Sequence, residues 1–558
     1  MYLEGLESKS FFPRAAGYIA KTGPGLLQSA MTLGAGSAAA SIVAGAYYGY
    51  SLLWVQPVAM FLGIMMLGAL SNVILTTGER PYKAFGRELH ISIAFLWALG
   101  TVVASIIWHF PQYGLAAGAA RDLYELANGP GTATGDGMFG FSSGGLAASI
   151  GVGVLILAIN IFTTWNYGKG GRGIKLYEWF LRTTIAVVVI AFGIVVVAKF
   201  GSIAWDRLAQ GFFGFQLDWS NPACVTTVLG AIGAAVGINM TFLYPYSLLA
   251  KGWGPKHKKL SRWDLGMSMF LPFVLVTSLV IIAMAITVND NNVKAKQIAA
   301  PAAELEAKDP AAYEKALAKF EEEKANAVTI DGKLYVAEND EGKQILLTMA
   351  KVEAADKAGE TVSEEDRKTA DTLILPPKTS DFKPIQAAQS LTSVMGDTMG
   401  RLVFDLGFIA MTLGAISTHM VVCGFTFCEM FGMKQSVWTF RLFALTPAIG
   451  ILGVVLPSPM WMPIMASAIC LTMLPIAYIA FFIMNNKKSY IGEATGHGIG
   501  RVIFNVILLI AIAMCTIGAA IKLKGGVVDK IWPTKPAAEA PADPAEPVAP
   551  AAPEEDAE

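Results

Sequence analysis

The stretch GPGLLQSAMTLGAGSAAASIVAGAYYGY, residues 23–50, is long and apolar enough to cross a lipid bilayer, which takes about 20 mostly apolar residues. Its centre contains Gly34, Gly36 and Ser37, a combination that interrupts a helix. An interruption inside a membrane is tolerated only where the freed backbone groups line a cavity or find other partners. The stretch therefore predicts a discontinuous membrane-spanning helix.

A second interrupted stretch, VLGAIGAAVGINMTFLYPYSLL at 228–249, contains Gly237, Asn239 and Pro245. It is the sixth apolar stretch of the chain, so the two breaks hold corresponding positions in two halves of five helices. Paired breaks of this kind are typical of the binding site of inverted-repeat transporters. Close helix packing by small residues is the alternative, and for one break alone it would be preferred. Two breaks in register favour the substrate site.

The composition fits a membrane protein: 54% of the 558 residues are hydrophobic, mean hydropathy is +0.51, and 15% are charged, against roughly 25% in soluble domains. We predict an all-α integral membrane protein of about eleven spans. The candidate spans are 24–48, 52–76, 92–120, 144–166, 178–199, 222–250, 266–288, 398–430, 439–457, 461–484 and 501–522.

Positive charge sets the orientation, because cytoplasmic loops are rich in Lys and Arg. With eleven spans, the basic loops all fall on one side: 77–90, 167–177, 251–263, the stretch with Lys434 and Arg441, and the pair Lys487 and Lys488. The opposite short loops carry almost none. The pattern predicts a cell (inner) membrane protein with a cytoplasmic N-terminus.

Four regions follow from this pattern. Residues 1–288 hold spans one to seven, 289–385 form an extracytoplasmic hydrophilic insert, 386–523 hold spans eight to eleven, and 524–558 form a disordered Pro/Ala/acidic tail, also outside. The insert is expected to contain a helix rich in Ala, Glu and Lys, followed by a hairpin at VTIDGKLYVAENDEG.

Other classes of function find no support in the chain. A net charge of −1 argues against a nucleic-acid partner. The five cysteines lie in apolar stretches without CxxC spacing, which indicates no disulfide framework or zinc site. HExxH and Walker-type motifs are absent, so neither an enzyme nor an ATP-driven pump is expected, and no cofactor. The partners expected are the lipid bilayer and a transported cation or small solute.

Several stretches, in order, resemble the Nramp family of divalent-metal transporters: GPGLL (23–27), AGAYYGYSLLWV (44–55), TTGERPYKAFGRE (76–88), GIKLYEWFLR (173–182), LGAISTHMVVCGFTFCEMFG (413–432) and LTMLPIAYIAFFIMNNKKSYIG (471–492). The resemblance covers nearly all of the hydrophobic part. It implies eleven helices in a five-plus-five inverted repeat with discontinuous helices one and six.

The resemblance also exposes departures. Where the family has Asp-Pro-Gly-Asn in span one, this chain has Gly34, Ala35, Gly36 and Ser37. Where the family has Met-Pro-His in span six, it has Gly237, Ile238 and Asn239, and Ser467 replaces a Gln of span ten. The family's acidic span three aligns with SIIWHFPQYG at 105–114, which has no carboxylate. The substrate site implied is Gly34, Gly36, Ser37, Ala234, Gly237, Asn239 and Ser467.

These substitutions bear on the cargo. Loss of the Met argues against selection of Mn²⁺ or Fe²⁺, since oxygen ligands suit hard ions and Mg²⁺ keeps its waters if it has room. A roomy, oxygen-lined site favours a hard ion such as Mg²⁺, although a dication without a carboxylate is costly to bury. A carrier of a small organic solute, such as an amino acid, or of a monovalent cation on the same fold is the alternative. A receptor that has lost transport is a third hypothesis.

Ionisable groups within spans are functional candidates by default. His109 in span three is a candidate proton relay. Asp405 in span eight is the best intramembrane carboxylate, and His419 faces either the cavity or a neighbouring helix. We predict a proton or ion path over these three residues. The alternative for these residues is a buried hydrogen bond to a neighbouring helix. Glu429 lies near the cytoplasmic end, and exposure to water is the preferred interpretation for it.

Overall fold

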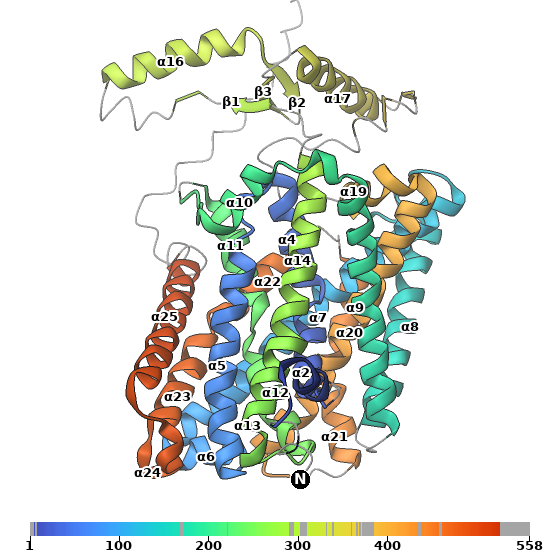
Figure 1. Cartoon of the computed structure of the whole chain (residues 1–558). Coiled ribbons are helices and arrows are strands. Elements are labelled where there is room, and N and C mark those ends of the chain that lie inside the picture. The colour runs from blue at the N-terminus through green and yellow to red at the C-terminus, as the bar shows by residue number, and fades with distance from the viewer. Residues whose placement is uncertain are drawn as a thin grey trace, which may run out of the picture.

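The computed structural model describes residues 5, 8–19, 21–167, 172–219, 221–289, 295–298, 300–301, 310–330, 332–337, 340–358, 360–363, 366–367, 370, 384–433, 437–456 and 460–524. The predicted acidic tail lies outside this part of the chain. The described residues are almost entirely helical, and the long helices lie side by side in one bundle (Figure 1).

Eight helical stretches of the described residues are long and apolar enough to cross a membrane, and two bent helix pairs bring the number to as many as ten. The unbroken helices in the bundle are α5 (Val55–Thr77), α7 (Ile91–Asn128), α8 (Ser143–Tyr167), α9 (Arg172–Ala198), α20 (Asp397–Met430) and α25 (Gly498–Leu523). Helix α9 holds the place of the predicted fifth span. The prediction of an all-α membrane fold is confirmed, and the described residues contain eight to ten of the about eleven spans predicted.

Both predicted breaks are present. Span one consists of α3 (Pro24–Thr32) and α4 (Ala35–Tyr48), which meet at 49°. Span six consists of α11 (Pro222–Ala235) and α12 (Ile238–Ala250). Helix α4 packs against α11 and α3 packs against α12, so the two breaks face each other inside the bundle.

Span ten is also broken, which the sequence analysis did not predict. It consists of α22 (Trp461–Leu471) and α23 (Leu474–Asn486), bent by 44°. Pro475 lies in the first turn of α23, where a backbone N–H would have no partner within the helix, so α23 tolerates it. The same proline cannot donate a hydrogen bond to α22, so α22 ends before it. An apolar stretch of helical length hid the break, because only this proline marks it.

The remaining spans are composite. Span seven runs through α13 (Lys258–Asp264), a π-helical turn (Leu265–Phe270), α14 (Leu271–Met284) and a second π-helical turn (Ala285–Asn289). Span nine joins α21 (Val437–Ala444) to a 3₁₀ helix (Thr446–Val455). The chain also forms short helices: α2 (Phe11–Ile19), α6 (Pro81–Glu88), α10 (Trp205–Phe213), α19 (Pro384–Met395) and α24 (Lys488–Ile491).

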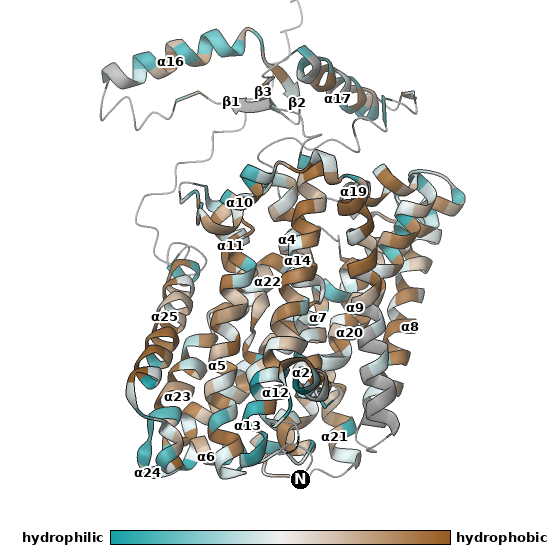
Figure 2. Ribbon diagram, in the orientation of Figure 1, coloured by the Kyte–Doolittle hydropathy of each residue, from teal (hydrophilic) through white to brown (hydrophobic). Residues whose placement is uncertain are grey.

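The two ends of the bundle differ (Figure 1). Helices α6, α13 and α24 lie at one end, called here the basic end, and α10, α19 and the insert lie at the other, called the insert end. Apolar residues dominate the helices between the ends, while hydrophilic residues gather at the basic end and in the insert (Figure 2).

The insert has a small fold of its own. Strands β1 (Ala295–Ile298), β3 (Lys333–Ala337) and β2 (Val328–Ile330) form an antiparallel sheet in the order β1-β3-β2, with α16 (Pro310–Lys324) and α17 (Asp340–Ala358). The β2–β3 pair is the predicted hairpin, and α16 is the described part of the predicted helix. Strand β1 and helix α17 were not predicted. Tyr335 and Leu346 are buried in its core.

Candidate functional site

The two breaks touch through Thr32, the last residue of α3. Its hydroxyl lies 3.4 Å from the carbonyl oxygen of Ala235, the last residue of α11, and 3.4 Å from the sulfur of Met240 in α12. Two helix C-termini therefore converge on one point. Because a helix C-terminus carries partial negative charge, this point favours a cation.

The first turns of α4 and α12 lie beside the same point. The hydroxyl of Ser37 donates to the carbonyl oxygen of Thr32 and to that of Gly34, at 3.2 Å from the latter. The side-chain oxygen of Asn239 accepts from the backbone N–H of Met240 at 2.9 Å. Both polar side chains thus stay close to the backbone of the breaks.

A small pocket lies where the breaks meet. It is lined by Met31, Thr32, Gly36, Ser37, Trp108, Gln112, Gly233, Ala234, Gly237, Asn239, Met240 and His419. Its free volume has room for about one water-sized particle. These residues come from α3, α4, α7, α11, α12 and α20, so the pocket is a product of the whole bundle.

Five of the seven residues predicted for the substrate site line this pocket: Gly36, Ser37, Ala234, Gly237 and Asn239. Gly34 lies just outside, where a Cβ would meet Ala415 and Gln112. Ser467 lies apart: α22 packs against α11 so closely that the carbonyl of Ser467 sits behind Gly233. Its hydroxyl is buried and has no hydrogen-bond partner among the described residues.

The pocket is less roomy than the small residues suggested. A Cβ on Gly36 would overlap the indole ring of Trp108. Trp108 and Gln112 of α7 therefore occupy the space that Gly36 and Gly34 leave open. A sequence shows where side chains are missing from one helix, but not which neighbour fills the gap.

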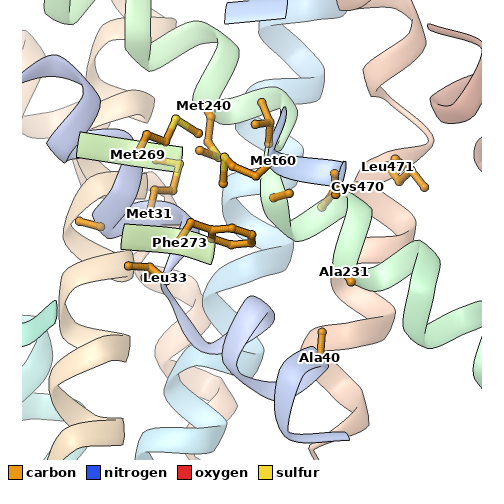
Figure 3. Close-up of a cluster of buried hydrophobic side chains, with 14 of the residues drawn as sticks. Met31, Leu33, Ala40, Met60, Ala231, Met240, Met269, Phe273, Cys470 and Leu471 are labelled. Carbon is orange, nitrogen blue, oxygen red and sulfur yellow. The ribbon is translucent and has the colours of Figure 1, made fainter. Parts of the chain in front are cut away.

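Six lining residues were missed by the sequence analysis: Met31, Thr32, Trp108, Gln112, Gly233 and Met240. The sulfur of Met240 accepts from the N–H of Gly237 at 3.3 Å, which places a thioether at the second break. Met31 and Met240 lie in a group of buried side chains that includes Met60 and Met269 (Figure 3). Position 237 has no Met, but Met240, three residues later, brings a thioether to the same break. The sequence GINM at 237–240 contains this Met, so it could have been predicted.

His109 and His419 face each other beside the pocket, with ring centroids 5.3 Å apart. Nδ1 of His109 lies 2.7 Å from the carbonyl oxygen of Ser105, so this nitrogen carries the proton and Nε2 is an acceptor. Neither Nε2 of His109 nor Nδ1 of His419 has a hydrogen-bond partner among the described residues. His419 also lines the pocket.

The third residue of the predicted path, Asp405, lies towards the insert end, fourteen positions before His419 on α20. The interpretation of Glu429 as a water-exposed group is wrong. Only 2% of its side chain is exposed, and Arg80 reaches it from the loop after α5 with a 2.9 Å ion pair. The partner lies 349 residues away, which is why the sequence concealed it.

The family model for natural resistance-associated macrophage protein-like (Nramp) proteins matches residues 25–308, just over half of the chain. The chain belongs to the Nramp family.

Curated Nramp relatives are distant. A divalent metal cation transporter MntH of Agrobacterium fabrum is 25% identical over 280 residues, which are 50% of this chain and 54% of that one. The NRAMP-like transporter smf-3 of Caenorhabditis elegans is 26% identical over 232 residues, 41% of this chain and 36% of that one. The matched segment therefore spans about half, or less, of these relatives.

Solved structures extend the likeness to nearly the whole chain. A mutant of the Eremococcus coleocola manganese transporter matches with a TM-score of 0.59 at 13% identity, covering 94% of this chain and 90% of that one. The same transporter in complex with an aromatic bis-isothiourea compound matches with a TM-score of 0.56 at 12% identity, covering 95% and 91%. At these identities the likeness concerns the fold.

The side chains that line the pocket supply several kinds of ligand atom. The described lining offers hydroxyl, amide, thioether and imidazole groups, and no Asp or Glu. Elsewhere in the described residues, no group of three or more His, Cys, Asp or Glu side chains is placed to hold a metal ion. Any cation held in the pocket would be bound by neutral ligands and helix ends.

Proposed function

We propose that this Nramp protein is a secondary transporter that moves a divalent metal cation across the membrane by alternating access. The observation that carries the proposal is the pocket at which both broken spans meet. Helix ends, Ser37, Asn239 and Met240 surround it, and interrupted helices at such a position are the hallmark of transporter sites.

Two features favour a cation over an organic solute. The C-termini of α3 and α11 converge on the pocket, and their partial negative charges attract a cation. The free volume fits an ion rather than an amino acid. The carrier of an organic solute remains the second candidate because the N-termini of α4 and α12 also border the pocket and suit a carboxylate.

The preference for a hard ion such as Mg²⁺ over Mn²⁺ and Fe²⁺ remains a prediction. The hydroxyl and amide oxygens of Thr32, Ser37 and Asn239 support it. The thioether of Met240 and the imidazole of His419 oppose it, because such ligands suit transition metals. The selectivity of the pocket therefore depends on which of these groups approach the ion.

The proposed proton or ion path divides into two sites. His109 and His419 form one, next to the pocket, where a proton taken up by either ring would repel a bound dication. Asp405 belongs to a separate cluster with Asp122 and Arg401.

Uptake into proteoliposomes of the full chain tests the function. We expect Mg²⁺ and Mn²⁺ uptake above that of empty vesicles, and competition between the two ions gives the selectivity. Asn239→Leu should lower uptake about 5- to 150-fold, because an amide lost from a desolvated site costs about 1–3 kcal/mol. Ser71→Ala, on α5 and outside the pocket, is the matched control. Uptake of amino acids with none of any divalent ion would overturn the proposal.

A further inference from the structure

A second buried polar cluster lies where α7 meets α20, towards the insert end. Arg401 of α20 holds Asp122 of α7 with both ends of its guanidinium: Nη2 lies 2.6 Å from Oδ1, and Nε lies 3.0 Å from Oδ2. Nη2 also donates to the backbone oxygen of Asp122 at 3.3 Å. Both side chains are less than a tenth exposed, so this pair is a buried connection between two spans.

Asp405 lies one helical turn beyond Arg401, against the carboxyl group of Asp122. It is fully buried, and neither of its oxygens has a hydrogen-bond partner among the described residues. Two ionised carboxylates can only accept hydrogen bonds, so neither can donate one to the other. A proton on Asp405 would change this, because the acid could donate to Asp122.

Among the described residues, no second positive charge lies beside Asp405. The carboxylate of Asp397 lies 3.7 Å from the guanidinium of Arg401 and is 59% exposed, so Arg401 also forms an ion pair on its solvent side. On α7, Glu125 adds negative charge, while Arg121 is occupied by Ser149 and by the carbonyl of Val454.

The other neighbouring helices bring no charge either. The sequences of α8, α19 and the 3₁₀ helix at Thr446–Val455, all packed against α20, have no acidic or basic residue. Arg441 of α21, which also packs against α20, contacts the carbonyl oxygen of Trp165 near the end of α8. The charged residues of α9 lie in its first eleven positions, at the basic end. One guanidinium thus faces two buried carboxylates, and two like charges sharing one site cannot both remain ionised in a medium of low polarity.

We propose that Asp405 is a proton-binding site, distinct from the cation pocket, which holds its proton while Arg401 pairs with Asp122. The proton passes to water when α7 and α20 separate at the insert end and solvent reaches the carboxyl group. Protonation then stabilises the closed arrangement, and rising pH favours the open one. Uptake of a proton from the insert side would in this way close that side of the transporter.

Infrared spectroscopy of the full chain tests the site directly. The wild type should show the carbonyl band of a protonated, buried carboxyl group, and Asp405→Asn should remove it. Asp397→Asn is the matched control: it removes a neighbouring Asp of Arg401 that is exposed, and should leave the band in place. A band of equal size in Asp405→Asn and wild type would overturn the proposal.

A second readout couples the site to transport and rests on the proposed function. Wild-type Mn²⁺ uptake should vary with pH by up to about tenfold per unit, the limit for one proton. Asp405→Asn should flatten this dependence, and Asp405→Glu should restore it. A dependence unchanged in Asp405→Asn would contradict the coupling. Absence of uptake with every ion would defeat the proposed function but not the infrared result.

Should Asp405→Asn fail to fold, wild type is compared with Asp405→Glu, because Asp264 is a second fully buried aspartate and the wild type alone would not separate the two. With ¹³C at the aspartate carboxyl carbons, a buried protonated aspartate gives an isotope-shifted band that persists at pH values where exposed aspartates have ionised. If every aspartate ionises together in this titration, the proposal is wrong.

Discussion

Gly36 and Trp108 show how closely the pocket is built at the scale of single residues. The indole ring lies where a side chain at position 36 would begin. Gly36 lies within α4 and has ordinary helical geometry, so its backbone conformation does not require glycine. The indole ring of Trp108 does require it, because the ring fills the space that a side chain would need.

We expect Gly36→Ala to push Trp108 into the pocket and to abolish uptake. The overlap should also lower the free energy of unfolding by about 1–3 kcal/mol, as overpacking of a filled site does. Gly68→Ala is the control, since a Cβ there meets nothing within 4 Å. Adding Trp108→Phe to Gly36→Ala should recover part of the uptake. Full activity of Gly36→Ala alone would contradict this account of the pocket.

At the scale of elements, ion pairs at the basic end connect loops that are far apart in sequence. Lys487, after α23, lies 2.9 Å from a carboxylate oxygen of Glu88 at the end of α6 and donates to its backbone oxygen at 2.7 Å. Arg87 contacts Glu88 at 2.9 Å and Glu79 at 2.8 Å. The loop between spans two and three is thereby fastened to the loop after span ten.

The pairing with Lys487, and then with Arg87, lowers the pKa of Glu88 below its ordinary value of 4.5. A carboxyl group whose pKa is lowered on folding stabilises the protein above the unfolded value, and this contribution is lost as the pH falls through the lowered value. We expect Lys487→Met to decrease the Tm slightly at neutral pH, and this difference from wild type to shrink well below pH 4.5, where only the hydrogen bond to the backbone oxygen of Glu88 is still lost.

Lys488→Met is the matched control, because Lys488 pairs with Glu493 at 3.6 Å and both side chains are mostly exposed. Its Tm should equal that of the wild type at either pH. A Tm difference for Lys487→Met that persists undiminished in acid would show that packing, rather than charge, is lost.

At the scale of the whole molecule, the basic loops and the insert lie at opposite ends of the bundle (Figure 1). The charge pattern predicts a cytoplasmic basic end and an extracytoplasmic insert. Trypsin added to intact cells should cut at insert lysines such as Lys315 and Lys319, both on α16, and spare the loop with Lys256 and Lys259. Inverted membrane vesicles should give the opposite pattern. Cleavage of the basic loops in intact cells would reverse the orientation.

The sequence by itself determined the class of fold and most of the span positions, because crossing a bilayer requires long apolar stretches that few other structures show. It also located two of the three breaks, where glycine and serine interrupt such stretches. The break in span ten escaped because a single proline, Pro475, marks it at the start of a new helix.

Only the tertiary structure decided how the pocket is filled and which charges are paired. Met240, Trp108 and Gln112 reach the breaks from their own or neighbouring helices, and Ser467 lies outside the pocket, with its carbonyl group packed behind Gly233. Asp122 meets Arg401 across 279 residues of chain. Local pattern fixes which segments enter the membrane, whereas contacts between segments depend on helix packing, which no single stretch of sequence contains.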